Sequence, residues 1–118
     1  GSGEDGDAPR GFDEIDVHAL DRLRREGAEH VLLDVREDTE HLLARIDGAR
    51  LVPLASLEER LGELAALRGQ RVVVHCHHGG RSRLACERLV AHGFTRLSNL
   101  SGGIDAWSRE IDTSVPRY

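Results

Sequence analysis

Short apolar segments along the chain alternate with segments whose apolar residues recur every three or four positions. Residues 31–35 are apolar except for Asp34, and residues 71–75 contain the apolar run 72–74 between Arg71 and His75. Such apolar runs are typical of parallel strands that are buried on both faces. Residues 50–53 and 96–100 predict two weaker strands. The segments between these strands have helical periodicity, so the chain is predicted to form an α/β fold.

The helical segments carry recognisable start and stop signals. Asp16 can cap a helix that ends at Gly27, and Ser56 with Glu59 has the spacing of a capping box at the start of a helix through Leu64. Further helices are predicted at residues 38–44, 82–92 and 103–111. Strands that alternate with helices of this length predict a parallel sheet covered on both faces.

Length and composition restrict the class of protein. A chain of 118 residues fits one domain, which we assign to residues 11–118. Residues 1–10 are polar and rich in glycine, so they are predicted to lack fixed structure, and Gly1-Ser2-Gly3 resembles a cloning remnant. The net charge of −5 argues against nucleic-acid partners. The longest apolar runs are far shorter than the ~18 residues of a membrane span, so no membrane partner is expected.

The two cysteines occupy different sequence environments. Cys86 belongs to an apolar helical stripe with Ala85 and Leu89, where a buried thiol is common. Cys76 ends a predicted strand and is followed by a glycine-containing loop. The prediction is therefore two free thiols in a reducing, cytoplasmic compartment, in preference to a disulfide with its narrow geometry.

The richest chemistry lies in the loop that reads Cys76-His77-His78-Gly79-Gly80-Arg81-Ser82. Gly79 and Gly80 permit the loop to curl so that its backbone N–H groups converge on one point, next to a helix N-terminus. Arg81 adds a planar guanidinium that suits oxyanions. A sulfur at that point is expected to be a thiolate nucleophile, which makes Cys76 and Arg81 the predicted catalytic residues.

Other residues of this loop are predicted to contact the substrate. Gly79 and Gly80 supply the cradle, and Ser82 either hydrogen-bonds the sulfur or satisfies backbone groups. For His77 and His78 three roles remain open: general acid, metal ligand, or loop surface that shapes donor access. Adjacent side chains on an extended segment alternate in direction, and no second ligand group has zinc-site spacing, so no metal is predicted.

Asp34 lies near the end of the predicted strand 31–35, and Arg36 follows that strand at the same edge of the sheet. Charged residues at a buried strand end survive burial when they are paired, so a structural brace for the loop is the favoured role. Direct contact with substrate is the alternative. Trp107 is predicted to be a core residue.

Four motifs, in order, resemble those of the rhodanese family and together cover roughly residues 13–111. They are residues 32–37 (Leu-Leu-Asp-Val-Arg-Glu), residues 47–53, the Cys76–Ser82 loop and residues 99–107, which contain Gly102-Gly103 and Trp107. Residues 44–49 depart from the family's Gly-His-Ile-Pro-Gly-Ala pattern, which affects the detail of that turn. The resemblance implies a three-layer α/β/α fold with a mostly parallel sheet of about five strands.

The resemblance also implies an activity. It predicts a sulfurtransferase of the thiosulfate:cyanide type that moves sulfur from thiosulfate or a persulfide, through a Cys76 persulfide, to cyanide, a thiol or a partner protein, without a cofactor. Four residues separate Cys76 from Arg81, as in the sulfurtransferases, whereas the related phosphatases and arsenate reductases have five. The alternatives are such a phosphatase or reductase on the same fold, or a non-catalytic interaction module.

Overall fold

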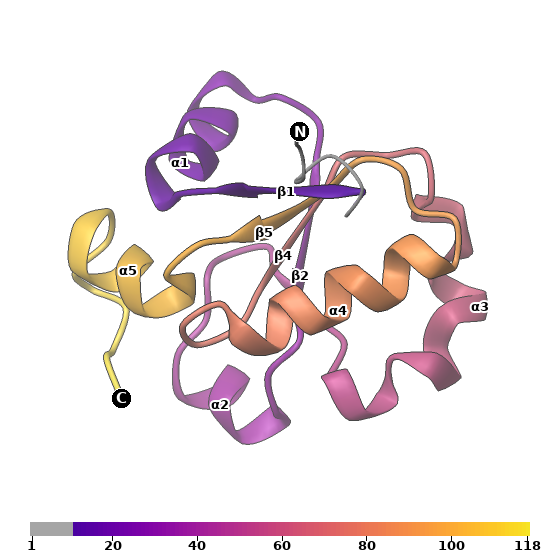
Figure 1. Ribbon diagram of the computed structural model, residues 1–118. Coiled ribbons are helices and arrows are strands. Elements are labelled where there is room, and N and C mark those ends of the chain that lie inside the picture. Colours follow the sequence, from indigo (N-terminus) through magenta and orange to yellow (C-terminus); the bar gives the residue numbers. More distant parts are fainter. Residues whose placement is uncertain (1–10) are drawn as a thin grey trace, which may run out of the picture.

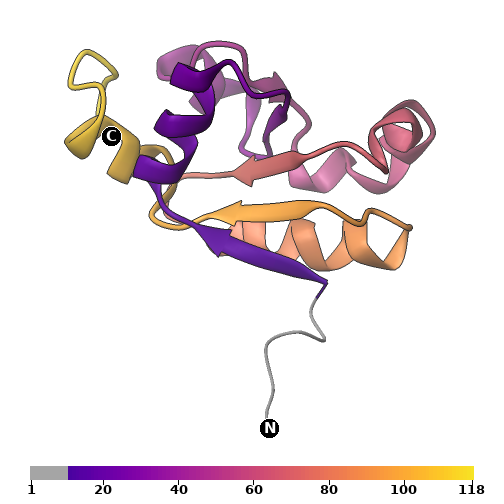
Figure 2. The same ribbon diagram turned by 90° about the horizontal axis from the view of Figure 1, so that it is seen from above.

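The computed structural model describes residues 11–118, so the predicted unstructured segment 1–10 lies outside the described residues. Its centre is one sheet of five parallel strands in the order β1-β5-β4-β2-β3. The strands are β1 (Phe12–Ile15), β2 (Val31–Asp34), β3 (Arg50–Leu51), β4 (Val72–His75) and β5 (Leu97–Leu100). Figure 2 shows β1 at the edge of this sheet, beside β5.

Helices cover both faces of the sheet, so the predicted three-layer α/β/α architecture is confirmed (Figure 1). The α-helices are α1 (Val17–Glu26), α2 (Asp38–Leu43), α3 (Leu61–Leu64), α4 (Gly80–Ala91) and α5 (Gly103–Glu110). Helices α1 and α5 pack on one face and α4 on the other. The start and stop of α1 are as predicted, because Asp16 accepts a hydrogen bond from the Ala19 N–H at 2.9 Å and Gly27 is left-handed with φ 67°.

The alternation of side chains along β4 decides where Cys76 points. Val72 and Val74 belong to the core cluster under α4, whereas Val73 belongs to the cluster under α1 and α5. Cys76 continues the first set, as the two-residue period of a strand requires, and reaches the α4 side of the sheet. Trp107 is 5% exposed in the opposite core, as predicted.

Three elements differ from what the sequence predicted. Strand β1 was not predicted, because its two central residues are acidic and the segment is too short for a clear alternation; pairing with β5 makes it a strand. The single helix expected from Ser56 to Leu64 is wrong: 3₁₀ turns occupy residues 54–56 and 58–60, and the short α3 follows. Ser56 sits inside the first 3₁₀ turn, where it cannot be an N-cap. Helix α4 begins at Gly80, two residues before the predicted start.

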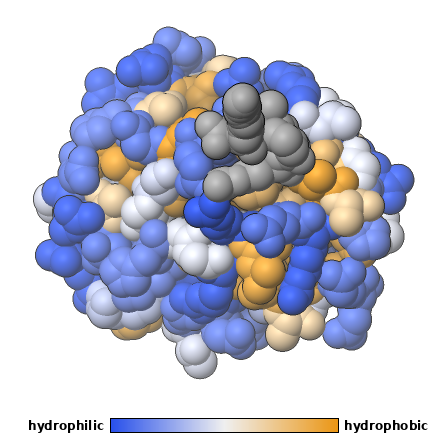
Figure 3. Space-filling model, in the orientation of Figure 1, coloured by the Kyte–Doolittle hydropathy of each residue, from blue (hydrophilic) through white to orange (hydrophobic). Residues whose placement is uncertain are grey.

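The surface visible in Figure 3 is mostly hydrophilic, with small apolar patches. Among residues 11–118, no helix has the length and apolar character required to cross a membrane.

Candidate active site

The loop between β4 and α4 curls around the sulfur atom of Cys76. The Sγ atom accepts hydrogen bonds from the backbone N–H groups of Gly79, at 3.1 Å, and Ser82, at 3.3 Å. Gly79 has φ 118°, a left-handed conformation that side chains other than glycine rarely adopt, and it forms the N-cap of α4. Two backbone N–H groups therefore converge on the sulfur in this cradle, and the first turn of α4 supplies one of them.

Helix α5 supports the loop from behind. The N–H of Ile104 donates to the Cys76 carbonyl at 3.0 Å, and the N–H of Asp105 donates to the His77 carbonyl at 3.1 Å. Gly103 has φ 58°, and a Cβ atom at this position would collide with both carbonyl oxygens. The Gly102-Gly103 pair thus lets the N-terminus of α5 approach the loop backbone closely and fix its shape.

The Ser82 hydroxyl lies within reach of both kinds of partner that its sequence position suggested, the sulfur and a backbone carbonyl. This hydroxyl lies 3.4 Å from the Cys76 Sγ and 3.2 Å from the Gly79 carbonyl, and it also hydrogen-bonds the Oδ1 atom of Asn99. The buried Asn99 in turn donates from Nδ2 to the Gly79 carbonyl at 3.2 Å and to Glu14. Because a hydroxyl has one proton, Ser82 donates to one of these acceptors at a time.

Arg81 lies at the rim of the cradle and is held by Glu40 of α2. Its two terminal nitrogens donate to the two carboxylate oxygens of Glu40 at 2.7 and 2.9 Å. This hydrogen-bonded pairing with Glu40 raises the pKa of Arg81. The same contact with Arg81 holds the pKa of Glu40 far below its usual range.

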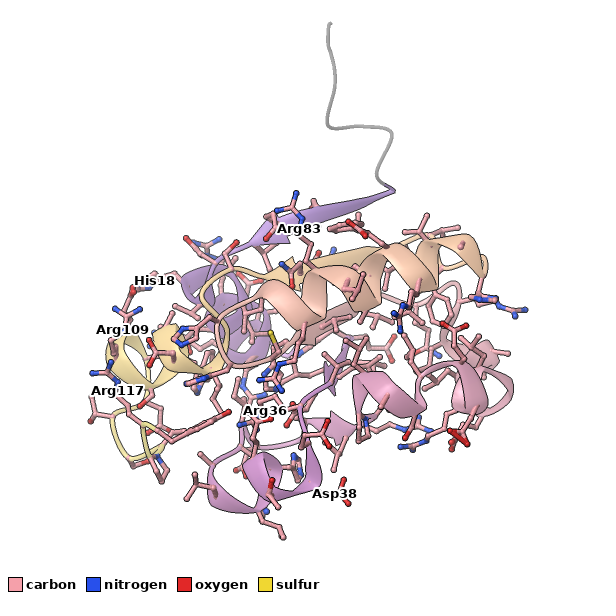
Figure 4. All side chains as sticks on the ribbon, turned by 60° about the horizontal axis from the view of Figure 1, so that its bottom comes forward. His18, Arg36, Asp38, Arg83, Arg109 and Arg117 are labelled. Carbon is pink, nitrogen blue, oxygen red and sulfur yellow. The ribbon has the colours of Figure 1, made fainter. Side chains whose placement is uncertain are left out.

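Asp34 and Arg36 form a fully buried ion pair. Arg36 donates to Asp34 through Nε at 2.9 Å and through a terminal nitrogen at 2.7 Å, and that nitrogen also reaches the Ala44 carbonyl at 2.6 Å. Burial raises the pKa of Asp34, but the hydrogen bonds from Arg36, with help from nearby His75 and His41, hold it below its usual value. Figure 4 shows Arg36 among the elements at the centre, whereas Arg83, Arg109 and Arg117 lie at the periphery.

With no exposed surface, the Asp34–Arg36 pair is suited to bracing α2 rather than to meeting a substrate. Arg36 also donates to the hydroxyl of Tyr118 at 2.8 Å, and this hydroxyl donates to Glu40 at 2.7 Å. A chain of hydrogen bonds therefore connects the Asp34–Arg36 pair to Arg81 through Tyr118 and Glu40.

The three histidines around Cys76 differ in environment. His75 is completely buried, and burial lowers its pKa to about 4, so its imidazole is neutral near pH 7. The ring of His77 stacks on the ring of Tyr118 with centroids 4.0 Å apart, and burial, aided by His78, lowers the pKa of His77. The side chain of His78 is 68% exposed. Within the described part of the chain, no cluster of three or more His, Cys, Asp or Glu side chains is arranged to hold a metal ion.

Cys86 is a buried thiol in the middle of α4, and both cysteines are free, as predicted. Burial raises the pKa of Cys86 to about 12, and the negative charges of Glu14 and Asp13 add to the effect. This sulfur therefore stays protonated at neutral pH.

Sequence reasoning missed three residues around the cradle: Glu40, Asn99 and Tyr118. Glu40 had a local signal, because with Glu37 it forms a capping box at the start of α2. Asn99 was visible as an amide inside an apolar strand, where it requires hydrogen-bond partners. Tyr118 gave no local signal, since its contact with His77 joins distant parts of the chain.

Comparison with known proteins identifies the family. The family model described as a rhodanese-like domain matches residues 16–110, so the chain belongs to the rhodanese-like domain family. The protein named adenylyltransferase and sulfurtransferase MOCS3-1 from Zea mays is 36% identical over an alignment of 102 residues that covers 82% of this chain and 22% of that protein. The chain thus spans about a fifth of this relative.

Relatives of similar length also exist. A protein named sulfurtransferase from Allochromatium vinosum is 33% identical over 96 residues, which cover 81% of this chain and 88% of that protein. The structure of a thiosulfate sulfurtransferase from Pseudomonas aeruginosa matches with a TM-score of 0.74 and 30% identity, over 86% of this chain and 20% of that one. These similarities support sulfur transfer as the general class of reaction.

Proposed function

We propose that this domain transfers sulfane sulfur through a persulfide on Cys76. The observation that carries the proposal is the set of polar groups around one sulfur: two backbone N–H groups and the Ser82 hydroxyl lie within 3.4 Å of the Cys76 Sγ. Such donors stabilise negative charge on a thiolate and on the terminal sulfur of a persulfide. Cys86 is not proposed as a nucleophile, because its raised pKa keeps its thiol protonated.

The proposed reaction has two half-reactions. The Cys76 thiolate attacks the outer sulfur of the donor, either thiosulfate or a persulfide, and the donor's S–S bond breaks. Its electron pair leaves with sulfite or with a thiolate, and Cys76 keeps the sulfur as a persulfide. A thiophilic acceptor, which is cyanide, a thiol or a partner protein, then attacks that sulfur and restores the Cys76 thiolate.

The surrounding residues have proposed roles in both steps. Gly79 and Ser82 supply hydrogen-bond donors to the sulfur, and Gly80 is the first residue of α4. His77 and the exposed His78 line the path by which a donor reaches Cys76. Arg81 contributes a cation at the rim, whereas Asp34 and Arg36 brace the elements around it. Two free thiols suit a reducing compartment such as the cytoplasm.

The test is an activity comparison among wild type, Cys76→Ser and Cys86→Ser. Wild type and Cys86→Ser should form thiocyanate from cyanide when thiosulfate or glutathione persulfide is the donor, and Cys76→Ser should lose at least about a thousandfold in rate. None of the three should hydrolyse p-nitrophenyl phosphate. Phosphatase turnover that depends on Cys76, without sulfur transfer, would replace this proposal with the phosphatase alternative.

A further inference from the structure

The cation at the rim of the cradle is already paired. Glu40 meets the guanidinium of Arg81 with both carboxylate oxygens, at 2.7 and 2.9 Å, in the two-pronged geometry that makes such pairs strong. The Arg81 side chain is 37% exposed and Glu40 is 17% exposed, so solvent screens the pair only in part. An incoming anion therefore meets a neutralised pair instead of a free guanidinium.

Other contacts hold the Glu40 carboxylate in this position. Its Oε1 atom accepts the Glu37 N–H at 3.1 Å, in the capping box of α2, and its Oε2 atom accepts the Tyr118 hydroxyl at 2.7 Å. Because the pKa of Glu40 lies far below its usual range, this carboxylate stays ionised throughout the pH range of an assay. The guanidinium of Arg36, which also contacts Tyr118, is fully buried against Asp34.

We propose that Glu40 is a specificity-determining residue that neutralises Arg81 and thereby makes the domain favour persulfide donors over thiosulfate. This inference rests on the proposed function. Thiosulfate carries two negative charges and must approach the Cys76 thiolate, so it needs an uncompensated cation. A persulfide group carries at most one, and the other charged groups of glutathione persulfide lie away from the sulfur that is attacked. In the favoured step the Cys76 thiolate attacks the outer sulfur of R–S–S⁻, the S–S bond breaks, RS⁻ leaves, and Cys76 retains the persulfide anion.

The test compares Glu40→Gln with a matched control on the same helix. Gln keeps one oxygen that can accept from the Glu37 N–H and from one terminal nitrogen of Arg81. The variant therefore removes the negative charge and one of the two acceptor oxygens. Asp38→Asn removes one negative charge from the exposed first turn of α2, at a residue that lies on the outside of the molecule in Figure 4. Each protein is assayed with sodium thiosulfate and with glutathione persulfide, at a fixed cyanide concentration, after circular dichroism has verified the fold.

Wild type should have a higher kcat/KM with glutathione persulfide than with thiosulfate. Glu40→Gln should raise kcat/KM for thiosulfate by about tenfold, mainly through a lower KM, because a nearby positive charge is uncovered. With glutathione persulfide, the kcat/KM of Glu40→Gln should stay within about twofold of the wild-type value. Asp38→Asn should change kcat/KM by no more than about twofold with either donor. An unchanged thiosulfate KM in a folded Glu40→Gln protein, or a wild-type preference for thiosulfate, would overturn the inference.

Wild type offers a second measurement that requires no variant. If Arg81 is neutralised, kcat/KM for thiosulfate should rise or stay level as salt increases, because the net interaction of this dianion with the site is repulsive. A steep fall with salt would indicate an available guanidinium and contradict the inference. Failure of both donors to sulfurate Cys76 would instead reject the proposed function itself.

Discussion

Cys76 and Cys86 lie in the same core cluster and are both hidden from solvent, yet the fold surrounds the two sulfurs with different groups. Cys76 stands where β4 ends and α4 begins, and it receives hydrogen bonds from Gly79 and Ser82. Cys86 lies on the buried face of α4, where burial raises its pKa to about 12. Burial alone disfavours a thiolate, whereas hydrogen-bond donors of the kind found around Cys76 can stabilise one.

The two cysteines differ in their surroundings because the backbone around Cys76 is placed to donate hydrogen bonds to its sulfur. The donors to Cys76 exist because Gly79 adopts a left-handed conformation and because α5 clamps the loop carbonyls. Weakening any of these supports should make Cys76 behave more like Cys86.

Gly103→Ala should have the largest effect among such changes. The added Cβ would collide with the carbonyl oxygens of Cys76 and His77, so α5 and the loop must separate. We expect activity to fall by about a hundredfold, as for a displaced catalytic group, and stability to fall by about 1–3 kcal/mol. Steady-state kinetics and urea denaturation measure the two effects.

Gly62→Ala is the matched control for this change. Gly62 lies in α3, its φ is not positive, and nothing lies within 4 Å of the position of an added Cβ. This variant should keep full activity. Equal losses in both variants would mean that contact between α5 and the loop does not shape the cradle.

Ser82→Ala should have an intermediate effect. It removes the hydroxyl 3.4 Å from the Cys76 Sγ but keeps the backbone N–H at 3.3 Å. Loss of one of several donors should lower kcat by about tenfold. Ser98→Ala, which alters a serine bonded to Asp13, serves as control and should leave kcat unchanged. An unaltered kcat in Ser82→Ala would mean that this hydroxyl hydrogen-bonds only Gly79 and Asn99 and does not act on the sulfur.

The alkaline stability of the fold provides the smallest and most specific test. In the native protein Cys86 remains protonated up to about pH 12, whereas the unfolded thiol ionises near 9.0. Above pH 9 the unfolded state thus binds fewer protons, so stability should fall as pH rises, by up to about 2 kcal/mol at pH ~10.5. Cys86→Ala should show a shallower fall in urea denaturation. Parallel curves for the two proteins would show that Cys86 is not shielded as described.

The fold was largely predictable because its main strands are continuous apolar runs. The 31–35 and 71–75 segments became β2 and β4 with boundaries within one residue of those predicted, and Asp16 and Gly27 bound α1 as expected. Strand β1 was not predictable from its own four residues, since its state is decided by pairing with β5. For the same reason, local capping signals at Ser56 did not determine the 3₁₀ turns found there.

The parts of the candidate site that lie within one sequence segment were predictable. The contacts between residues from distant segments were not. The Cys76–Ser82 loop and the Gly102-Gly103 element were recognised from sequence, because each motif carries its own glycines. The pairing of Arg81 with Glu40, and the stacking of Tyr118 on His77, join residues from different elements. Such contacts depend on tertiary packing, and this is why Arg81 was predicted as an anion-binding cation without its neutralising partner.

The central claim is that Cys76 carries the transferred sulfur. Wild-type protein is exposed to glutathione persulfide, desalted and examined by intact mass spectrometry and peptide mapping, before and after cyanide treatment. The account predicts one added sulfur atom on the peptide that contains Cys76, its removal by cyanide as thiocyanate, and no added mass on the Cys86 peptide. Sulfur found on Cys86, or an unmodified Cys76 in a folded protein, would contradict it.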